Sequence, residues 1–448
     1  MADLLRLATA GSVDDGKSTL VGRLLYDTKS VLADQLEAVE RASVDRGLST
    51  PDLSLLVDGL RAERDQGITI DVAYRYFATG RRTFVLADTP GHIQYTRNTV
   101  TGASTAQLAI LLVDARKGVV EQTRRHAAVL AMLGVPRLVL AVNKIDLVGY
   151  DEDSFAVIAK EFAGHVTALG YDEADLLAVP VSALHGDNVV TRSARTPWYD
   201  GSTLLEHVEA VPVEPDPHHL PFRLPVQYVI RPRTAAHPDY RGYAGLVAAG
   251  IVRVGDEIAV LPAGRRTTVT GIDTADGPLT AAGAGLSVTL LLADDVDVAR
   301  GDLIAAAGSP PPLSDTLTVT VCWLSDRPLR PGARVLVKHG TRTEAAIVTA
   351  LLDRFDEQRL STVDGPAELV LNEIGRVTVR VASPLPADDY AASRRTGSLL
   401  VIDPATGATL GAGLVGGPLP VPAEDRAAAP GPSHHPRTDA RDLLSPGP

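Results

Sequence analysis

Five short apolar segments recur in the first two hundred residues, and longer stretches with polar positions separate them. The segments are Leu4–Ala10, Thr83–Ala87, Leu108–Val113, Leu138–Val142 and Leu177–Val181. Each is nearly continuous in apolar side chains, which is typical of a strand buried on both faces of a parallel sheet. Intervening stretches such as Gln122–Leu133 and Ser154–Leu169 are long enough for crossover helices. The pattern therefore predicts an α/β domain with a mostly parallel sheet.

Two Pro-rich breaks mark a change of pattern in the rest of the chain. After the first, Val211–Pro217, short runs rich in Val, Ile and Thr lie between Gly, Asp and Pro, as in Gly250–Pro262. Such runs are typical of antiparallel barrels or sandwiches. The second break, Gly308–Pro312, divides this part into two pieces, each large enough for a small domain. We therefore expect an α/β domain at residues 1–210 and antiparallel β domains at 211–310 and 311–418. The Pro- and Ala-rich residues 419–448 predict a disordered tail.

Composition narrows the class of protein. At 448 residues the chain is too long for one core, and its net charge of −12 argues against a general nucleic-acid binder, although a local basic patch can lie on an acidic protein. The single cysteine, Cys322, excludes a disulfide framework, and we expect it to be buried. No apolar run is long enough for a membrane span, and the N-terminus lacks the features of a signal peptide. We expect a cytoplasmic protein that binds neither nucleic acid nor membrane.

The first apolar segment runs into a glycine-rich loop. The loop, Gly11–Ser18, fits the pattern G-x-x-x-x-G-K-[ST] and precedes a stretch compatible with a helix. Backbone N–H groups of such a loop bind phosphate oxygens; Lys17 would neutralise β- and γ-phosphate charge, and the Ser18 hydroxyl would ligate Mg²⁺. The alternative is a chance glycine-rich turn. The predicted phosphate-binding residues are Gly11, Ser12, Val13, Asp14, Asp15, Gly16, Lys17, Ser18 and Thr19.

A second candidate motif, Asp88, Thr89, Pro90 and Gly91, follows the segment Thr83–Ala87. Asp88 at a strand end can hold Mg²⁺ through water, and Gly91 can donate its N–H to a γ-phosphate. His92 comes next, where a hydrolytic GTPase places the side chain that orients the attacking water. The structural alternative for His92 is a surface-loop histidine.

A third motif, Asn143, Lys144, Ile145 and Asp146, ends the segment Leu138–Val142 and favours guanine over adenine. Asp146 can accept two hydrogen bonds from the guanine edge, whereas adenine offers no matching donors and would leave a buried carboxylate unpaired. The Lys144 stem can cover the base. Ser182, Ala183 and Leu184, after the last segment, fit a loop that supports the base from behind.

Thr69 lies between the phosphate loop and Asp88. A threonine here can give its hydroxyl to Mg²⁺ and its N–H to a γ-phosphate, but it can equally be an ordinary strand-forming residue. The predicted cofactors are GTP and Mg²⁺. The catalytic candidates are Lys17, Thr69 and His92, and the metal candidates are Ser18, Thr69 and Asp88.

These motifs together resemble the translation-factor class of GTPases, to which elongation factor Tu belongs. Within that class, residues 4–416 resemble the GTPase (large) subunit of bacterial sulfate adenylyltransferase. The segments that carry this resemblance include Ala8–Thr19, Glu63–Phe77, Asp88–Ser104 and Pro197–Tyr199. Asp14-Asp15 separates the two branches, because translation factors usually have Asp-His there. The resemblance implies a P-loop GTPase domain followed by two β-barrels.

The resemblance also implies a function. A separate small catalytic subunit of sulfate adenylyltransferase makes adenylylsulfate and diphosphate from ATP and sulfate, the first step of sulfate assimilation, and GTP hydrolysis on the large subunit drives this uphill step. The chain departs from the family at Ile93, where an acidic residue is usual. This departure leaves the residues predicted to bind the nucleotide intact. What it puts in question is the rate of GTP hydrolysis or the coupling of hydrolysis to the partner subunit. Two alternatives remain: a translation-type factor that delivers RNA, and a GTP-binding scaffold that no longer hydrolyses.

Overall fold

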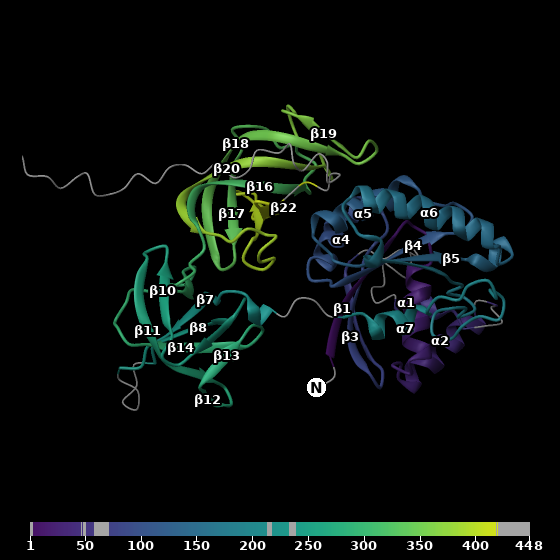
Figure 1. The fold of residues 1–448 in the computed structure, drawn as a ribbon, viewed down its shortest axis with the longest axis horizontal. Coiled ribbons are helices and arrows are strands. Elements are labelled where there is room, and N and C mark those ends of the chain that lie inside the picture. The colour runs from purple at the N-terminus through teal and green to yellow at the C-terminus, as the bar shows by residue number, and fades with distance from the viewer. Residues whose placement is uncertain are drawn as a thin grey trace, which may run out of the picture.

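The computed structural model describes residues 3–45, 47, 51–57, 71–212, 217–232, 239–417 and 419. A six-stranded sheet forms the first domain (Figure 1). Its strands, in spatial order, are β2 (Ala73–Ala78), β3 (Arg82–Asp88), β1 (Asp3–Gly11), β4 (Leu108–Asp114), β5 (Leu138–Asn143) and β6 (Leu176–Pro180). Only the β2–β3 pair is antiparallel. The five predicted strands and the predicted α/β class are confirmed, and β2 was not predicted.

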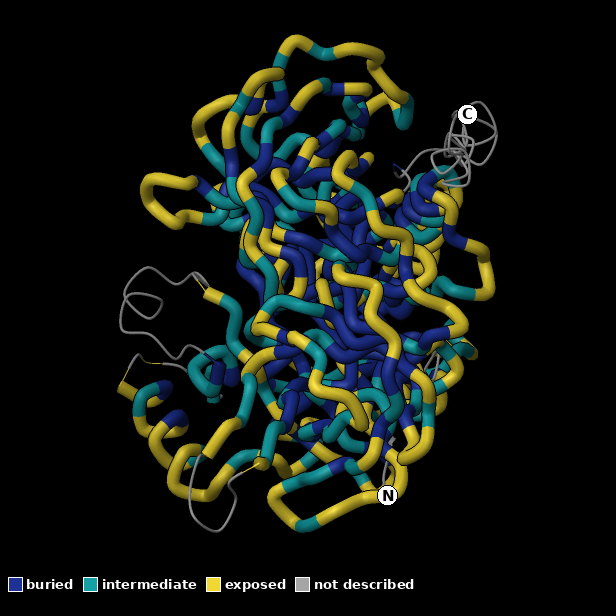
Figure 2. Tube along the Cα trace, turned by 90° about the vertical axis from the view of Figure 1, so that its left-hand side faces the viewer, coloured by how far each residue is buried: buried dark blue, intermediate teal, exposed yellow. Residues whose placement is uncertain are grey.

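Helices cover both faces of this sheet, which explains the continuous apolar runs. One face packs against α4 (Thr96–Ala103), α5 (Glu121–Met132) and α6 (Glu152–Ala168), and the other against α1 (Lys17–Asp27) and α7 (Leu204–Ala210) (Figure 1). Helix α2 (Ala33–Asp45) is mostly exposed. Every residue of β4 and β5 is buried, and the buried segments run through the interior in Figure 2.

Two closed antiparallel barrels follow. The strands of the first are β7 (Arg223–Ile230), β8 (Gly242–Leu246), β10 (Glu257–Leu261), β11 (Arg265–Thr274), β14 (Ser287–Leu292) and β15 (Leu303–Ala306). Strand β12 (Gly277–Leu279) extends its sheet, and β9 (Ile251–Arg253) pairs with β13 (Ala281–Gly283). The β10–β11 pairing closes the ring. Closure removes exposed sheet edges. The prediction that antiparallel β structure follows the α/β domain is thereby confirmed.

The second barrel closes in the same way, through its β17–β18 pairing. Its strands are β16 (Leu313–Trp323), β17 (Arg334–His339), β18 (Arg342–Asp356), β20 (Ile374–Pro386), β21 (Ser398–Ile402) and β22 (Thr409–Val415), with β19 (Ser361–Asp364) added at one end. The predicted domain boundaries fall between elements and stay predictions. Except for Leu419, the predicted tail lies outside the described residues.

The second barrel packs against the first domain on its α4–α5 side. Cys322, which is fully buried as expected, and Tyr390 belong to the same apolar cluster as the α5 residues. Burial raises the pKa of the Cys322 thiol to about 12. The Tyr390 hydroxyl donates to Leu133 O at 2.8 Å, and Arg97 Nη2 donates to Thr409 O at 3.0 Å. The segment that follows His92 is therefore anchored to the barrel.

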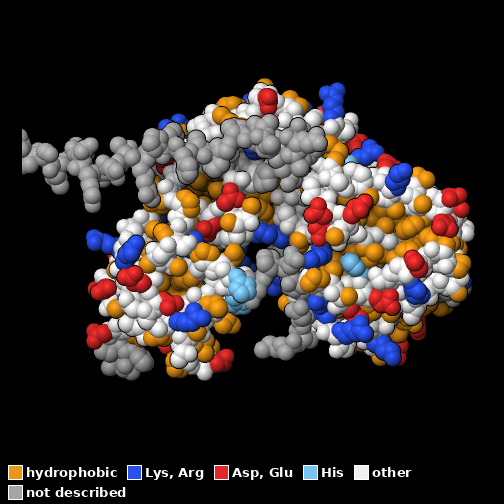
Figure 3. Space-filling model, in the orientation of Figure 1, with side chains coloured by type: hydrophobic (Ala, Val, Ile, Leu, Met, Phe, Trp, Pro, Cys, Tyr) orange, Lys and Arg blue, Asp and Glu red, His pale blue; other side chains and the backbone are white. Residues whose placement is uncertain are grey.

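On the face of the molecule drawn in Figure 3, charge is not segregated by sign. Acidic and basic side chains are intermingled on the face drawn in Figure 3, over the barrels and the first domain alike. Among the described helices, none is long and apolar enough to cross a membrane.

Candidate functional site

The predicted motifs gather where the parallel strands end. Strand β1 ends at Gly11, β3 at Asp88 and β5 at Asn143, while Ser182 lies two residues beyond β6. The carboxyl ends of parallel strands share one edge of the sheet, where ligands bind in open α/β folds. The structure therefore brings together the three motifs and the Ser182–Leu184 loop. The candidate Thr69 lies outside the described residues.

The loop between β1 and α1 has the backbone of an anion-binding turn. Asp14 and Gly16 have positive φ values of 67° and 93°. Gly16 caps α1 without a side chain, and the free N–H groups of a first helical turn favour phosphate oxygens. A β-carbon on Gly16 would stand 2.4 Å from Asn143 Nδ2, so only glycine fits this approach.

Lys17 is buried inside the loop. Its ammonium donates to Gly11 O at 2.8 Å and to Ser12 O at 2.7 Å. Burial lowers the pKa of Lys17, while the nearby Asp88 and Asp15 carboxylates oppose that shift. The positive charge of Lys17 is thus held within the loop, where phosphate oxygens can replace the two carbonyl oxygens as its acceptors.

Asp88 is held rigidly at the end of β3. The Thr9 hydroxyl donates to Asp88 Oδ1 at 2.8 Å, and the Thr89 hydroxyl donates to Thr9 O at 2.6 Å. All three side chains are fully buried, and Ser18 is partly exposed at the start of α1. In the described part of the chain, no cluster of three or more His, Cys, Asp or Glu could hold a metal.

Gly91 and His92 begin the segment that leads to α4. A β-carbon on Gly91 would lie 2.3 Å from Lys17 Nζ and 2.6 Å from Gly11 O, so this segment touches the phosphate loop. His92 is partly exposed, and its Nδ1 accepts the Gln94 N–H at 3.3 Å. Its ring meets the Tyr95 ring edge-on, with the centroids 6.0 Å apart. His92 therefore stands one residue from the contact with Lys17.

Asn143 links the predicted phosphate and base loops. Its Nδ2 donates to Asp15 O at 2.7 Å, and its Oδ1 accepts the Ala183 N–H at 2.9 Å. Lys144 adds a second link: its ammonium donates to Asp14 O and pairs with Asp114 at 3.1 Å. Asn143 and Lys144, at the end of β5, thus connect the phosphate loop, the Ser182–Leu184 loop and the end of β4.

Asp114, at the end of β4, anchors Lys144. Burial alone would raise the pKa of this carboxyl, but hydrogen bonds from Arg116 and Lys144 outweigh it, so the pKa lies below its usual range. Asp114 is therefore an anion at neutral pH. Its charge holds the Lys144 ammonium, whose stem is predicted to cover the base.

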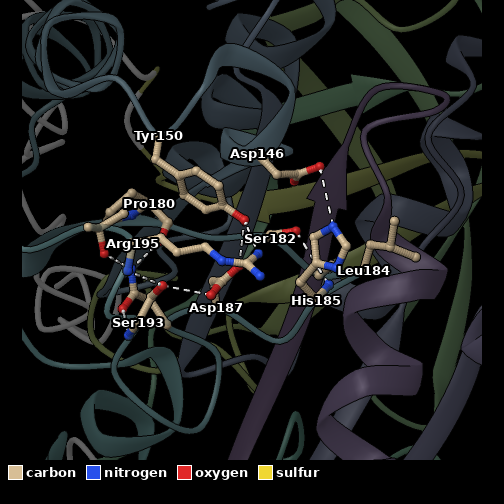
Figure 4. Close-up of polar contacts among 12 residues, drawn as sticks. Asp146, Tyr150, Pro180, Ser182, Leu184, His185, Asp187, Ser193 and Arg195 are labelled. Carbon is tan, nitrogen blue, oxygen red and sulfur yellow. Dashed lines mark hydrogen bonds and ion pairs between the residues drawn. The ribbon is translucent and has the colours of Figure 1, made fainter.

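Asp146 and the Ser182–Leu184 loop face each other (Figure 4). Asp146 Oδ2 lies 3.9 Å from His185 Nε2, and the Asp146 side chain is only 12% exposed. Ser182 is buried, whereas Leu184 is exposed. Arg23 of α1 fixes the loop from below by donating to Leu184 O at 2.6 Å.

A polar network fixes the far side of the same loop (Figure 4). The Tyr150 hydroxyl donates to Asp187 Oδ2 at 2.9 Å and accepts from Arg195 Nη1 at 2.6 Å. The Ser193 hydroxyl donates to Asp187 Oδ1 at 2.6 Å, and Asp187 O accepts the Ser182 N–H at 3.2 Å. Tyr150 lies four residues after Asp146, so the network ties the two base-side loops together.

Sequence reasoning missed several of these residues, and His126 is the clearest case. It lies fully buried in α5, and its Nδ1 accepts the Gly11 N–H at 3.0 Å. Burial and the nearby Lys17 and Arg125 charges lower the pKa of His126 to about 3, so the ring is neutral. A lone histidine in a helical stretch carries no sequence signal for this role. Asp114 did carry a sequence signal, because it stands at the end of a strand, as Asp88 does.

This architecture, with its loop and two closed barrels, defines a GTPase of the elongation-factor type. The model of the elongation factor Tu GTP binding domain matches residues 2–213, and that of the GTP-eEF1A C-terminal domain-like family matches residues 316–416. The chain belongs to the sulfate adenylyltransferase subunit 1 family. The resemblance to this family is thereby confirmed. Like the members of the family, the chain is an enzyme subunit that contains a GTPase domain.

Three relatives carry this assignment. Sulfate adenylyltransferase subunit 1 of Methylorubrum populi is 48% identical over 434 residues, which span 96% of this chain and 90% of that protein. The same subunit of Laribacter hongkongensis is 48% identical over 92% of this chain and 85% of its own length. The bifunctional enzyme CysN/CysC of Mycobacterium tuberculosis is 54% identical over 93% of this chain and 67% of its own length.

Proposed function

We propose that this chain binds and hydrolyses GTP and thereby drives adenylylsulfate synthesis by a separate catalytic subunit. The observation that carries the proposal is the double contact of Asn143 with Asp15 O and with the Ala183 N–H. It joins a phosphate-type loop to two loops with the chemistry of guanine recognition. The family membership supplies the reaction that hydrolysis would serve.

At the phosphate end, the loop amides and Lys17 bind the phosphates. Lys17 already donates to two carbonyls, and phosphate oxygens are stronger acceptors for an ammonium group. Ser18 and Asp88, with Thr69, would hold Mg²⁺, which neutralises charge on the β- and γ-phosphates when bound. The buried Thr9–Asp88 hydrogen bond keeps the Asp88 carboxylate in place.

At the base end, Asp146 accepts the two guanine donors. Its carboxylate is mostly buried beside His185, so a base without donors would leave it poorly solvated. Lys144, fixed by Asp114, covers one face of the base, and Ser182, Ala183 and Leu184 support it from behind. The network around Asp187 keeps that support rigid.

His92 orients the attacking water. It follows Gly91, which touches Lys17, so a γ-phosphate that binds Lys17 displaces this segment. The displacement reaches α4, where Arg97 donates to carbonyl oxygens of the second barrel at Leu324 and Thr409. This path offers a mechanical link from the nucleotide to surfaces that a partner could sense.

The partner is the small catalytic subunit, which joins sulfate to ATP and releases diphosphate. The word subunit in the names of the relatives implies a heteromeric assembly. We expect that complex to work in the cytoplasm. RNA delivery is the second candidate, favoured by the match to the elongation factor Tu domain. Co-purification separates the two, because one predicts a bound adenylyltransferase subunit and the other bound aminoacylated RNA.

Single-turnover GTP hydrolysis with and without the catalytic subunit tests the proposal. We expect the partner to accelerate phosphate release from the intact complex. A chain that binds GTP but releases no phosphate, with or without partner, would instead be a scaffold, and Ile93 is the first position to revert to an acidic residue. That outcome contradicts hydrolysis as the driving step.

A further inference from the structure

The Asp15 carboxyl group is buried in a loop whose proposed ligand is anionic. Asp15 is only 2% exposed, and its Oδ2 accepts the Ser12 N–H at 2.6 Å. The electrostatic neighbours that affect it most are Lys17 and Lys117, which stabilise its charge, and Asp114, which opposes it. None of the steps proposed above uses this carboxylate.

One hydrogen bond and one charge–charge interaction make Asp15 a competitor of the phosphates. Loops of this kind attract phosphate through backbone N–H groups and a lysine ammonium. The Asp15 carboxylate takes up the Ser12 N–H, and its negative charge acts on the Lys17 ammonium. Both effects reduce the positive potential that the loop offers to a second anion.

Burial makes the charge matter more. Burial raises the pKa of Asp15, although Lys17 and the Ser12 N–H act in the opposite direction. The carboxylate has therefore lost much of its water, and an unscreened charge acts over longer distances than a solvated one. A nucleotide that brings further negative charge into the loop increases this cost.

The adjacent Asp14 offers a comparison within the same loop. Its side chain is exposed, and its structural contact is through the backbone carbonyl, which accepts from Lys144. Solvent screens its carboxylate, so its effect on a bound phosphate is smaller. The two aspartates thus carry the same charge in very different surroundings.

We propose that Asp15 sets the nucleotide exchange rate of this chain by weakening its hold on guanine nucleotide phosphates and speeding the release of GDP. The inference rests on the proposed function of this loop as the GTP site. Asp15 acts through Lys17 and the Ser12 N–H, and is therefore a positioning residue. The chain then exchanges GDP for GTP at a rate set by its own loop.

Dissociation of a fluorescent GDP analogue, measured by stopped flow on the full chain, tests this inference. Asp15→Asn keeps an oxygen that accepts the Ser12 N–H and removes the charge. We expect release to slow about tenfold, the scale of one partly screened unit charge. Asp34→Asn, at an exposed position in the first turn of α2, is the control, with an expected change below about twofold.

The sign of the effect separates this role from a structural one. If Asp15 only holds the loop, the weaker acceptor in Asp15→Asn loosens the loop, and release becomes as fast as in the unmodified chain or faster. That result overturns the inference. Asp15→His, measured at pH 8, is a second variant without the charge and must also release GDP more slowly. If the unmodified chain binds no GDP analogue, the proposed function itself fails, which is a distinct outcome.

Discussion

Gly91 lies against Lys17 so closely that a β-carbon on Gly91 would stand 2.3 Å from Lys17 Nζ. The same β-carbon would lie 2.6 Å from Gly11 O and 2.8 Å from the Ser12 carbonyl carbon. The segment after β3 therefore rests on the phosphate loop itself. Under the proposed function, a γ-phosphate that binds Lys17 would change this contact.

Gly91→Ala is expected to destabilise the chain without nucleotide by about 1–3 kcal/mol, the usual cost of overpacking a tight contact. Two of the three close atoms belong to the backbone, which cannot rotate away as a side chain does. Urea unfolding of the nucleotide-free chain measures the loss. Gly80→Ala is the control, because a β-carbon there meets no atom within 4 Å. Equal stability of the two variants would show that the Gly91 contact is not populated.

His92→Ala is expected to keep GTP affinity and to lower hydrolysis by about 100-fold, the scale of losing a group that positions a proton-transferring water. His92 is partly exposed and contacts its own turn, so its removal leaves the loop ligands in place. His219→Ala, at an exposed position in the short 3-10 helix Pro217–His219, should change neither quantity. An unchanged hydrolysis rate in His92→Ala would assign His92 a structural role.

Asp146→Asn is expected to lower GTP affinity about 10- to 100-fold, because the amide offers one acceptor where guanine needs two. Xanthine carries a carbonyl in place of the guanine amino group, so xanthosine triphosphate should gain affinity. Nucleotide competition measures both changes. Asp172→Asn, on the surface before β6, is the neutral control. Retained preference for GTP over xanthosine triphosphate would place the base elsewhere.

We expect the buried His126 to make the folded chain less stable in acid. Its pKa falls from 6.5 to about 3 on folding, so its contribution is fully present above pH 6.5 and is lost as the pH falls towards 3. His126→Gln should remove up to about 1.4 kcal/mol per pH unit of that slope. Unfolding by urea between pH 7 and pH 4 measures it. Identical slopes in both proteins would mean that His126 takes up a proton in the folded state.

The sequence predicted elements best where burial is two-sided. Strands β4 and β5 are buried at every position, and their continuous apolar runs were found within a residue of their ends. Strand β2 lies at the sheet edge, where Tyr74 and Tyr76 are exposed, so it lacks the two-sided burial that marked the predicted strands. Helix α2 buries only Val39 and Ser43, so little of it contributes to a core.

The site was predictable where spacing along the chain defines it. The loop Gly11–Ser18 and the strand ends Asp88 and Asn143 follow from local patterns. The contacts that hold them depend on residues far apart in sequence: Gly11 meets His126, and Asn143 meets Asp15. Only the folded sheet brings such pairs together, and no local pattern encodes them.

Adenylylsulfate synthesis by this chain and a small catalytic subunit, with each component omitted in turn, tests the central claim most directly. With ATP and sulfate present, the product should rise above its GTP-free level only when both chains and GTP are present. The His92→Ala chain should bind GTP yet fail to raise it. An equal yield with GDP in place of GTP, or without this chain, would contradict the account.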